Sequence, residues 1–212
     1  IYVATAARFM PSRRVLTAAQ AKALGVHPRY FGDTSDAVLM TSRGGDVYDR
    51  TFMSSFIRPG IGARNWVSRS NYPALNVVQT GPHEISVYVN QDYAQASAHM
   101  HRYSLRLDGF GSLHAEYGGG SLLTKPIRFT GKQLSINFST SAAGSVQVEI
   151  QDAAGAPISG FTAADCTPQI GNEIDRTVAW KSGTDVSAMA GKPVRLRFIV
   201  KDADVYSFVF TD

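Results

Sequence analysis

The chain has 212 residues, of which 44% are hydrophobic and 18% are charged, and its formal net charge is +4. This composition is that of an ordinary globular protein with one large or two small domains. The positive charge would suit nucleic-acid binding, but the arginines are scattered and Arg13 and Arg14 form the only basic doublet. We therefore expect no nucleic acid among its partners.

Cysteine content and hydropathy exclude further classes. Cys166 is the only cysteine, so the chain has no intrachain disulfide and no cysteine-based metal cluster, and we expect a small buried side chain there. No apolar run approaches the roughly 18 residues that span a bilayer, so we expect no membrane span. The start, IYVATAARFMPSRR, has neither an initiator Met nor the order of a signal peptide, which suggests a fragment of a longer protein.

The first expected element is a helix in LTAAQAKALG, where Thr17 and Gln20 have the spacing of a capping box and Gly25 can end the helix. Residues 36 to 52 follow as an expected hairpin. An apolar strand, a Gly-Gly-Asp turn and a second strand carrying Tyr48 and Phe52 make up this hairpin. An isolated hairpin is marginally stable, so it must belong to a larger sheet.

A long segment with little regular pattern, IRPGIGARNWVSRSNYP, covers residues 57 to 73. Loops of this length in compact domains are usually functional or disordered. Sugars need hydrogen-bonding forks for their hydroxyls and flat apolar faces for their C–H groups. Two interpretations remain open. In the first, Trp66 packs beneath the loop and the arginines hold the loop to neighbouring backbone. In the second, some of the polar and aromatic side chains of the segment line a carbohydrate cleft. The candidate substrate-binding residues of the segment are Arg58, Arg64, Asn65, Trp66, Arg69 and Tyr72.

Residues 74 to 93 are expected as two strands around a TGP turn. Glu84 begins the second strand and is the best local carboxylate for a pocket, although a strand-end charge facing solvent is the commoner explanation. The tip residues Asn90, Asp92 and Tyr93 are open to the same two interpretations. His99 and His101 should share one face of the next strand, but no third ligand is visible, so we expect no metal and no cofactor.

The sequence pattern changes near residue 105, from long loops to closely spaced strands with small turns. We therefore place a domain boundary at the strand HRYSLRLDGF. Beyond it, period-two runs predict closely spaced strands in KQLSINFS, GSVQVEIQD, PVRLRFIVK and DVYSFVF. Small turns are expected between them at AAG, DAAGAP and AGKP, and a short helical turn at DVSAMAG with Asp185 as its cap. Asp202 and Asp204 suit either a structural calcium ion or, more commonly, a polar turn.

Several segments resemble parts of one known architecture. Residues 36 to 52, with TSR-G-G-x-x-Y-x-R, and residues 74 to 93 resemble hairpins of propeller blades. The run from Leu105 to Phe210 resembles the exit from a propeller into an appended β-sandwich. Together they resemble the C-terminal half of bacterial proteins akin to the five-bladed-propeller glycosidases, the group of invertases, levanases and arabinanases.

This resemblance implies an all-β fold, with the last blades of an incomplete propeller in residues 1 to 105 and an antiparallel, jelly-roll-like sandwich in residues 106 to 212. It implies part of a glycoside-hydrolase-like protein whose catalytic carboxylates lie upstream, so no catalytic residue is assigned. The implied partners are a carbohydrate and the upstream blades, and a polysaccharide substrate favours a secreted or periplasmic location. The alternative is a non-catalytic carbohydrate-binding or surface-assembly module, in which the sandwich carries the recognition.

Overall fold

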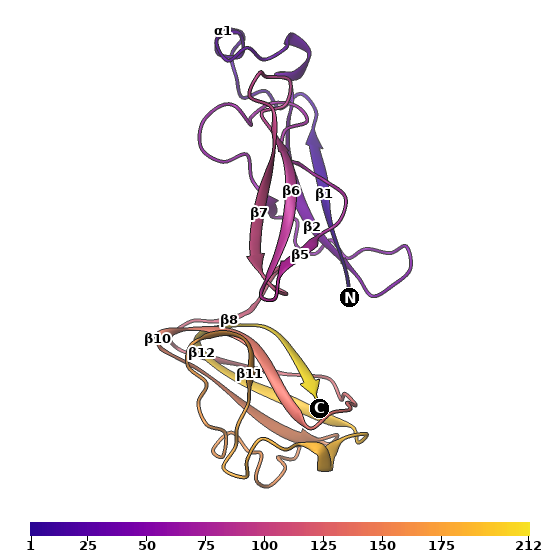
Figure 1. Cartoon of the computed structure of the whole chain (residues 1–212), viewed down its shortest axis with the longest axis vertical. Helices are drawn as coiled ribbons and strands as arrows, with labels where there is room; N and C mark the ends of the chain where they lie inside the picture. Colours follow the sequence, from indigo (N-terminus) through magenta and orange to yellow (C-terminus); the bar gives the residue numbers. More distant parts are fainter. The chain divides into compact units, whose positions relative to one another are not determined.

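The structure, a computed structural model that describes all 212 residues, is built of antiparallel β-sheets with little helix. Strands hold 48% of the residues and helices 6%, which confirms the expected all-β class. The chain forms two compact units, Ile1–Leu105 (unit 1) and Arg106–Asp212 (unit 2) (Figure 1). None of its helices has the length and apolarity needed to cross a bilayer.

Unit 1 contains two antiparallel sheets. The first has the order β1–β2–β3, and in the second β6 pairs with β4 and β5 and also with β7. Ala37 and Ile57 of the first sheet form a small core with Val87 and Val89 of the second. The strands are β1 (Tyr2–Met10), β2 (Thr34–Ser42), β3 (Ser55–Ile57), β4 (Tyr72–Pro73), β5 (Val78–Gly81), β6 (Glu84–Gln91) and β7 (His99–Arg106).

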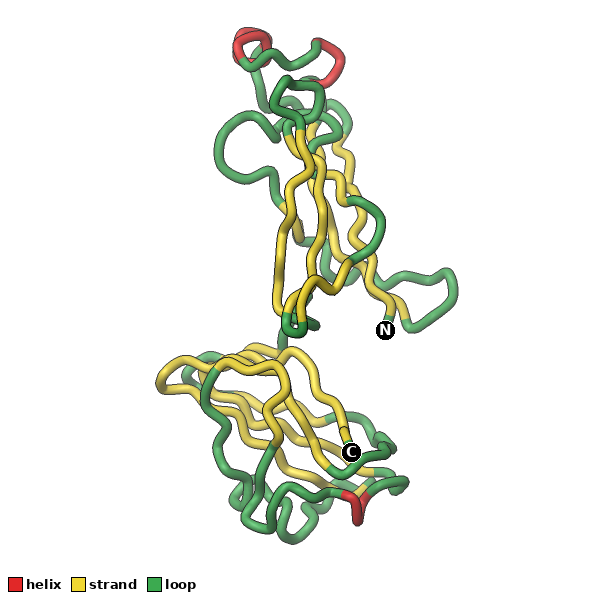
Figure 2. The backbone as a smooth tube through the Cα atoms, viewed as in Figure 1, coloured by secondary structure: helices red, strands yellow, loops and turns green.

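The expected helix is confirmed as α1 (Ala18–Ala23), together with its capping box. The Thr17 hydroxyl accepts a hydrogen bond from the Gln20 amide at 3.2 Å, and the Gln20 side chain accepts one from the Thr17 amide at 2.9 Å. Gly25 follows with a φ of +70°, a conformation that glycine adopts at low cost. A 3-10 helix, η1 (Pro28–Tyr30), completes the helical end of unit 1 (Figure 2).

The second strand of the hairpin expected at residues 36 to 52 does not form where it was predicted. Only Asp49 pairs there, through an isolated bridge to Thr41 of β2, and regular pairing resumes in β3. Tyr48 is 41% exposed and Phe52 is 73% exposed. The aromatic residues Tyr48 and Phe52 therefore suggested a strand, but both are exposed, and no second layer covers them and holds the backbone in a strand.

Unit 2 is organised by two long strands, β10 (Gln133–Asp152) and β12 (Val194–Thr211), which pair antiparallel along their whole length. Their register shifts between Thr140 and Ser145, and the sheet curls into a half-barrel. The shorter strands are β8 (Leu113–Ala115) and β9 (Gly120–Leu123), both beside β12, and β11 (Asn172–Thr177), beside β10.

Two predicted turns are wrong, because AAG at residues 142 to 144 lies inside β10 and DAD at residues 202 to 204 lies inside β12. Both segments lie where the paired strands bend. Asp202 has a φ of +43° there, and Gly144 has no room for a Cβ, which would lie 2.7 Å from the carbonyl oxygen of Lys201. The turn-forming residues therefore build a β-bulge, which bends a strand without reversing it.

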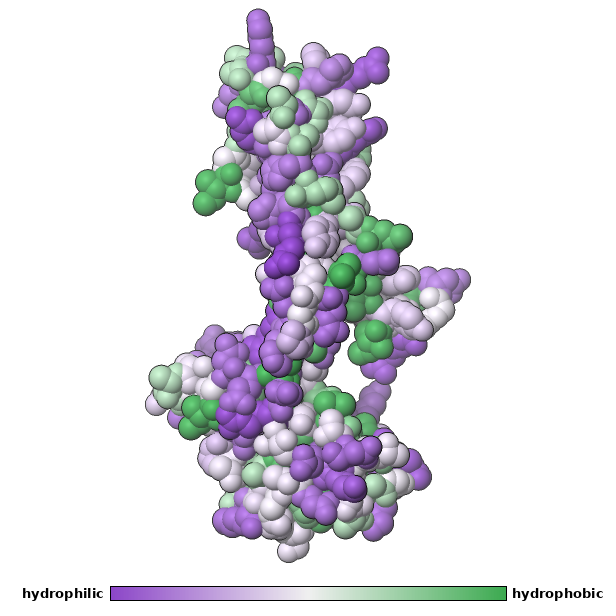
Figure 3. Space-filling view, viewed as in Figure 1, coloured by the Kyte–Doolittle hydropathy of each residue, from purple (hydrophilic) through white to green (hydrophobic).

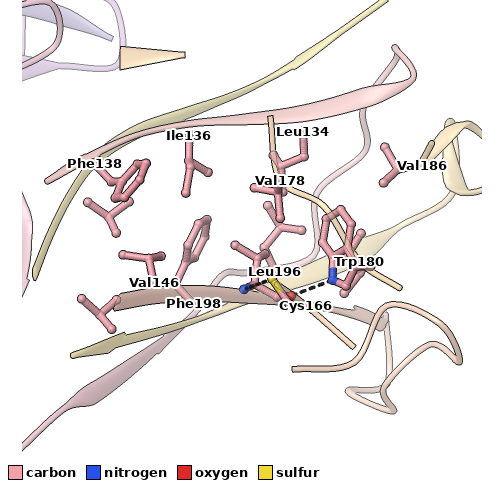
Figure 4. Packing of buried hydrophobic residues seen from close by; sticks show 14 of the residues in the cluster. Leu134, Ile136, Phe138, Val146, Cys166, Val178, Trp180, Val186, Leu196 and Phe198 are labelled. Atoms are coloured by element: carbon pink, nitrogen blue, oxygen red, sulfur yellow. Dashed lines mark hydrogen bonds between the residues drawn. The ribbon is translucent and has the colours of Figure 1, made fainter. Parts of the chain in front are cut away.

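The curled sheet encloses the core of unit 2. Leu134, Ile136 and Phe138 from the first half of β10 point toward Val146 and Phe198 on the other side of the bend (Figure 4). These residues carry the period-two pattern of the sequence, which is confirmed as the core pattern. Two loop residues close the core by binding the backbone of Val148. The Trp180 indole donates to the carbonyl of Val148 at 2.8 Å, and the Cys166 sulfur accepts a hydrogen bond from the amide of Val148 at 3.3 Å.

The short helical turn in DVSAMAG is present as the 3-10 helix η2 (Ser187–Met189). The expected cap is wrong by one residue, because the N-cap of η2 is Val186, whose side chain makes no capping hydrogen bond. Asp185 stands one position earlier, where its Oδ1 accepts a hydrogen bond from the Ser187 amide at 2.8 Å. Hydrogen bonding to the side chain of Ser187, followed by that to its amide, lowers the pKa of Asp185. Met189 is buried and anchors the turn to the core.

Candidate ligand-binding cleft

A cleft of about 660 Å³ lies in unit 1, where β1 ends, β2 begins and β3 ends. These strand ends lie toward the same end of unit 1 as α1 (Figures 1 and 2). The polar and aromatic side chains that line the cleft include Arg8, Arg13, Asp36, Arg58 and Trp66.

A doubly hydrogen-bonded ion pair forms one wall of the cleft. Arg8 of β1 and Asp36 of β2 are direct cross-strand partners. Arg8 donates from Nε to Oδ1 at 2.8 Å and from Nη2 to Oδ2 at 2.6 Å, and its third nitrogen donates to the carbonyl of Met53 at 2.7 Å. Hydrogen bonding to Asp36 raises the pKa of Arg8. The side chains are 31% and 18% exposed, so the pair is a fixed, partly desolvated feature of the cleft.

The long loop supplies a second wall. Arg58 directly follows β3, and the half-buried Trp66 reaches back so that its indole nitrogen donates to the carbonyl of Gly60 at 3.3 Å. Gly60 has a φ of +78°, which favours glycine at this point of contact. Arg58 and Trp66 are the two predicted site residues that the structure brings together in the cleft.

Three other predicted residues hold the loop to its surroundings. Arg64 donates to the hydroxyl of Ser97 at 3.0 Å, and the Asn65 side chain accepts from the Asp92 amide at 2.7 Å. Arg69 donates to the hydroxyl of Tyr93 at 3.3 Å, which raises the pKa of Arg69. The contacts of Arg64, Asn65 and Arg69 are those of loop anchors, and none of the three lines the cleft.

Tyr72 and Glu84 also lie outside the cleft. Tyr72 is in β4, paired with Asn90 of β6. Glu84 begins β6, accepts from the Thr80 hydroxyl at 2.7 Å and forms an ion pair with Arg102 at 3.1 Å. The hydrogen bond from Thr80 lowers the pKa of Glu84, with a smaller contribution from the charge of Arg102. These contacts are those of a strand-end charge.

The end of the loop that leads into β4 is held in an uncommon backbone conformation. Arg69 and Asn71 have φ values of +64° and +66°, although neither is glycine. Such conformations cost about 1 to 3 kcal/mol each and persist only where the surrounding structure holds them. The fully buried Asn71 donates to the carbonyl of Ser35 at 2.9 Å and to that of Asn65 at 3.1 Å. Because Ser35 lines the cleft, this network fixes the loop against one of its walls.

His99 and His101 lie on one face of β7, with ring centroids 5.9 Å apart, and Tyr103 continues the row at 4.6 Å from His101. No group of three or more His, Cys, Asp or Glu side chains is placed so that it could hold a metal ion. In unit 2, the carboxylate of Asp202 accepts from the Ser141 hydroxyl, and that of Asp204 accepts from Ser112 at 2.6 Å.

Sequence reasoning missed Arg8, Arg13 and Asp36. A usable signal was present for two of them: Arg8 interrupts the apolar run YVATAARFM, and Asp36 stands directly before AVLM. Charged residues in half-buried strands are usually paired with an opposite charge, so the two runs are candidates for adjacent strands. Arg13 follows the end of β1 and carried no comparable signal.

Comparison of the chain with protein-family models, with curated proteins and with solved structures found no match.

Proposed function

We propose that the chain is part of a glycoside-hydrolase-like, carbohydrate-active protein and that the cleft of unit 1 contacts the sugar. One observation carries this proposal: the cleft combines a fixed carboxylate, Asp36, with the guanidinium of Arg58 and the half-buried ring of Trp66. Carboxylates and guanidinium groups hydrogen-bond to sugar hydroxyls, and an indole offers an apolar face on which a sugar ring can stack. A cleft of this size has room for more than one sugar ring.

The catalytic groups are proposed to lie upstream of this chain. Glycosidases need two carboxylates that flank the scissile bond. Asp36 is the only carboxylate in the lining, and Arg8 occupies both of its oxygens, which leaves it unsuited to proton transfer. The role that its geometry supports is binding and orientation of a hydroxyl.

We further propose that the two sheets of unit 1 are the last blades of a β-propeller and that unit 2 is an appended β-sandwich. Consecutive antiparallel sheets packed face to face support the first assignment. Apolar side chains exposed on unit 1 support upstream blades as a covering partner (Figure 3). The most exposed are Ile1, Tyr2, Val47, Phe52, Ile61 and Leu75.

A non-catalytic binding module is the second candidate, and one observation on unit 2 favours it. Tyr117 is 64% exposed, and the Lys201 ammonium lies 4.3 Å from the centre of its ring. An exposed ring beside a hydrogen-bond donor is a binding platform for a sugar. In that case unit 2 carries the recognition, and the protein attaches to a glycan or to a cell surface.

A panel of immobilised oligosaccharides, probed with the chain and with two variants, separates these functions. The proposal predicts that Trp66→Ala weakens binding by about 1 to 3 kcal/mol, by analogy with the stacking of a base on an aromatic ring. Tyr117→Ala should bind like the parent. The reverse pattern would support the binding module on unit 2, and a panel without any bound glycan would rule out both candidates.

A further inference from the structure

The net positive charge of the protein comes from unit 1. This unit has 11 Lys and Arg residues against 6 Asp and Glu, a formal charge of +5, whereas unit 2 has 10 against 11. Ten of the 11 basic residues in unit 1 are arginines. Arginine is always charged and presents a planar fork of donors that fits carboxylate, sulfate and phosphate groups.

Within unit 1, the cleft gathers three arginines around a single carboxylate. Arg8 neutralises Asp36, as described above, so the lining retains the charges of Arg13 and Arg58. Neither of these two guanidinium groups has a hydrogen-bond or ion-pair partner in the structure. The next nearest carboxylate in sequence, Asp33, does not line the cleft, and its Oδ1 accepts from the Ser12 amide at 2.7 Å.

Both unpaired arginines stand on backbone that the structure holds in place. Arg13 follows Ser12, whose φ is +63° and whose amide is bound to Asp33. Arg58 stands between the buried residues Ile57 and Pro59, and the indole of Trp66 is tied to Gly60 two residues further on. Donors whose backbone is already ordered lose less freedom when a ligand binds.

We infer that the cleft binds an anionic group of a glycan, either the carboxylate of a uronic acid or a sulfate ester; this inference rests on the carbohydrate function proposed above. A ligand that covers the cleft removes water from Arg13 and Arg58, and burial of an unpaired charge is costly. A neutral sugar satisfies hydroxyl hydrogen bonds but leaves both charges uncompensated. An anionic group compensates them and forms charge-assisted hydrogen bonds, which are about twice as strong as neutral ones.

The test is a binding measurement on a glycan panel with neutral, uronate-containing and sulfated oligosaccharides of matched length. We expect the acidic members to dominate, and Arg58→Gln and Arg13→Gln each to weaken their binding roughly 10-fold to 100-fold. Arg50→Gln is the matched control, because it removes the same charge from an exposed residue of unit 1 outside the cleft and should bind like the parent. Raising the salt from about 0.05 M to about 0.5 M should weaken binding by the parent more than binding by Arg58→Gln.

The outcomes separate this inference from the function on which it rests. Binding of uronate members alone identifies the carboxylate as the ligand group, and binding of sulfated members alone identifies the sulfate ester. Preferred binding of neutral sugars that survives both arginine substitutions would overturn the inference and leave the carbohydrate function standing. Absence of any glycan binding would overturn both. Equal binding of a short single-stranded RNA would also contradict the inference, because the cleft would then recognise charge without the sugar.

Discussion

Arg8 and Asp36 are direct cross-strand partners in β1 and β2, and two parallel hydrogen bonds of 2.8 and 2.6 Å join the guanidinium to the carboxylate. The residues are 28 positions apart in sequence, so the pair ties the two strands together across α1 and η1. A partly buried charge that loses its partner keeps its desolvation cost. Removal of one side chain therefore leaves the other charge uncompensated, so the stability losses from removing each of the two should not add.

A double-mutant cycle tests this coupling. Arg8→Gln and Asp36→Asn should each lower the free energy of unfolding of unit 1 by about 1 to 3 kcal/mol, because each leaves a charged partner unsatisfied. The double variant should lose less than the sum of the two. Denaturant titrations followed by Trp66 fluorescence in a Trp180→Phe background give the three values. Strictly additive losses would mean that the pair is not energetically coupled.

The bend in the β10–β12 pair predicts an intolerant glycine. A Cβ at Gly144 would lie 2.7 Å from the carbonyl oxygen of Lys201, so Gly144→Ala should destabilise unit 2 by about 1 to 3 kcal/mol through overpacking. Gly118→Ala is the control, since nothing lies within 4 Å of the added methyl group. Thermal unfolding followed by Trp180 fluorescence in a Trp66→Phe background measures both. Equal melting temperatures would show that the bend can widen freely.

The thiol of Cys166 is predicted to be unreactive in the folded protein. Burial raises its pKa, and the hydrogen bond from the Val148 amide opposes this only in part. Because the folded pKa is higher than the unfolded one, the folded state keeps a proton that the unfolded state releases. Stability should therefore fall as the pH rises above about 8.5, the ordinary pKa of a cysteine thiol.

Two measurements check the Cys166 prediction. A thiol reagent at pH 8 should leave the native chain unmodified and should modify it once denaturant is added. The alkaline loss of stability should shrink in Cys166→Ala, which has no thiol to titrate. Rapid modification of the native chain would show that the loop around Cys166 opens readily.

The sequence predicted those features that depend on local pattern. Thr17 and Gln20 lie within one turn of helix, so their spacing alone identified the capping box. Leu134, Ile136 and Phe138 alternate with polar residues because one face of β10 is buried, so their place in the core was also predictable. The change of sequence pattern near residue 105 coincides with the division between the two units.

Features that depend on a distant partner could not be predicted in this way. AAG and DAD have the composition of turns, and only the pairing of β10 with β12 shows that they form a bulge. Trp66 and Arg58 were identifiable by residue type, but the register that brings Arg8 beside Asp36 depends on two strands 28 residues apart. Residue type also suggested Arg64 and Arg69 as ligand-binding side chains, and their contacts are those of loop anchors.

Tryptophan fluorescence provides the most direct test of the proposed cleft, because the chain has two tryptophans, one in each unit. Trp66 lines the cleft, and Trp180 is 3% exposed in the core of unit 2. Titration of the chain with an oligosaccharide that it binds should change the emission of the parent and of Trp180→Phe, and leave that of Trp66→Phe unchanged. A change that persists in Trp66→Phe and disappears in Trp180→Phe would place the ligand on unit 2 and contradict the assignment of the cleft.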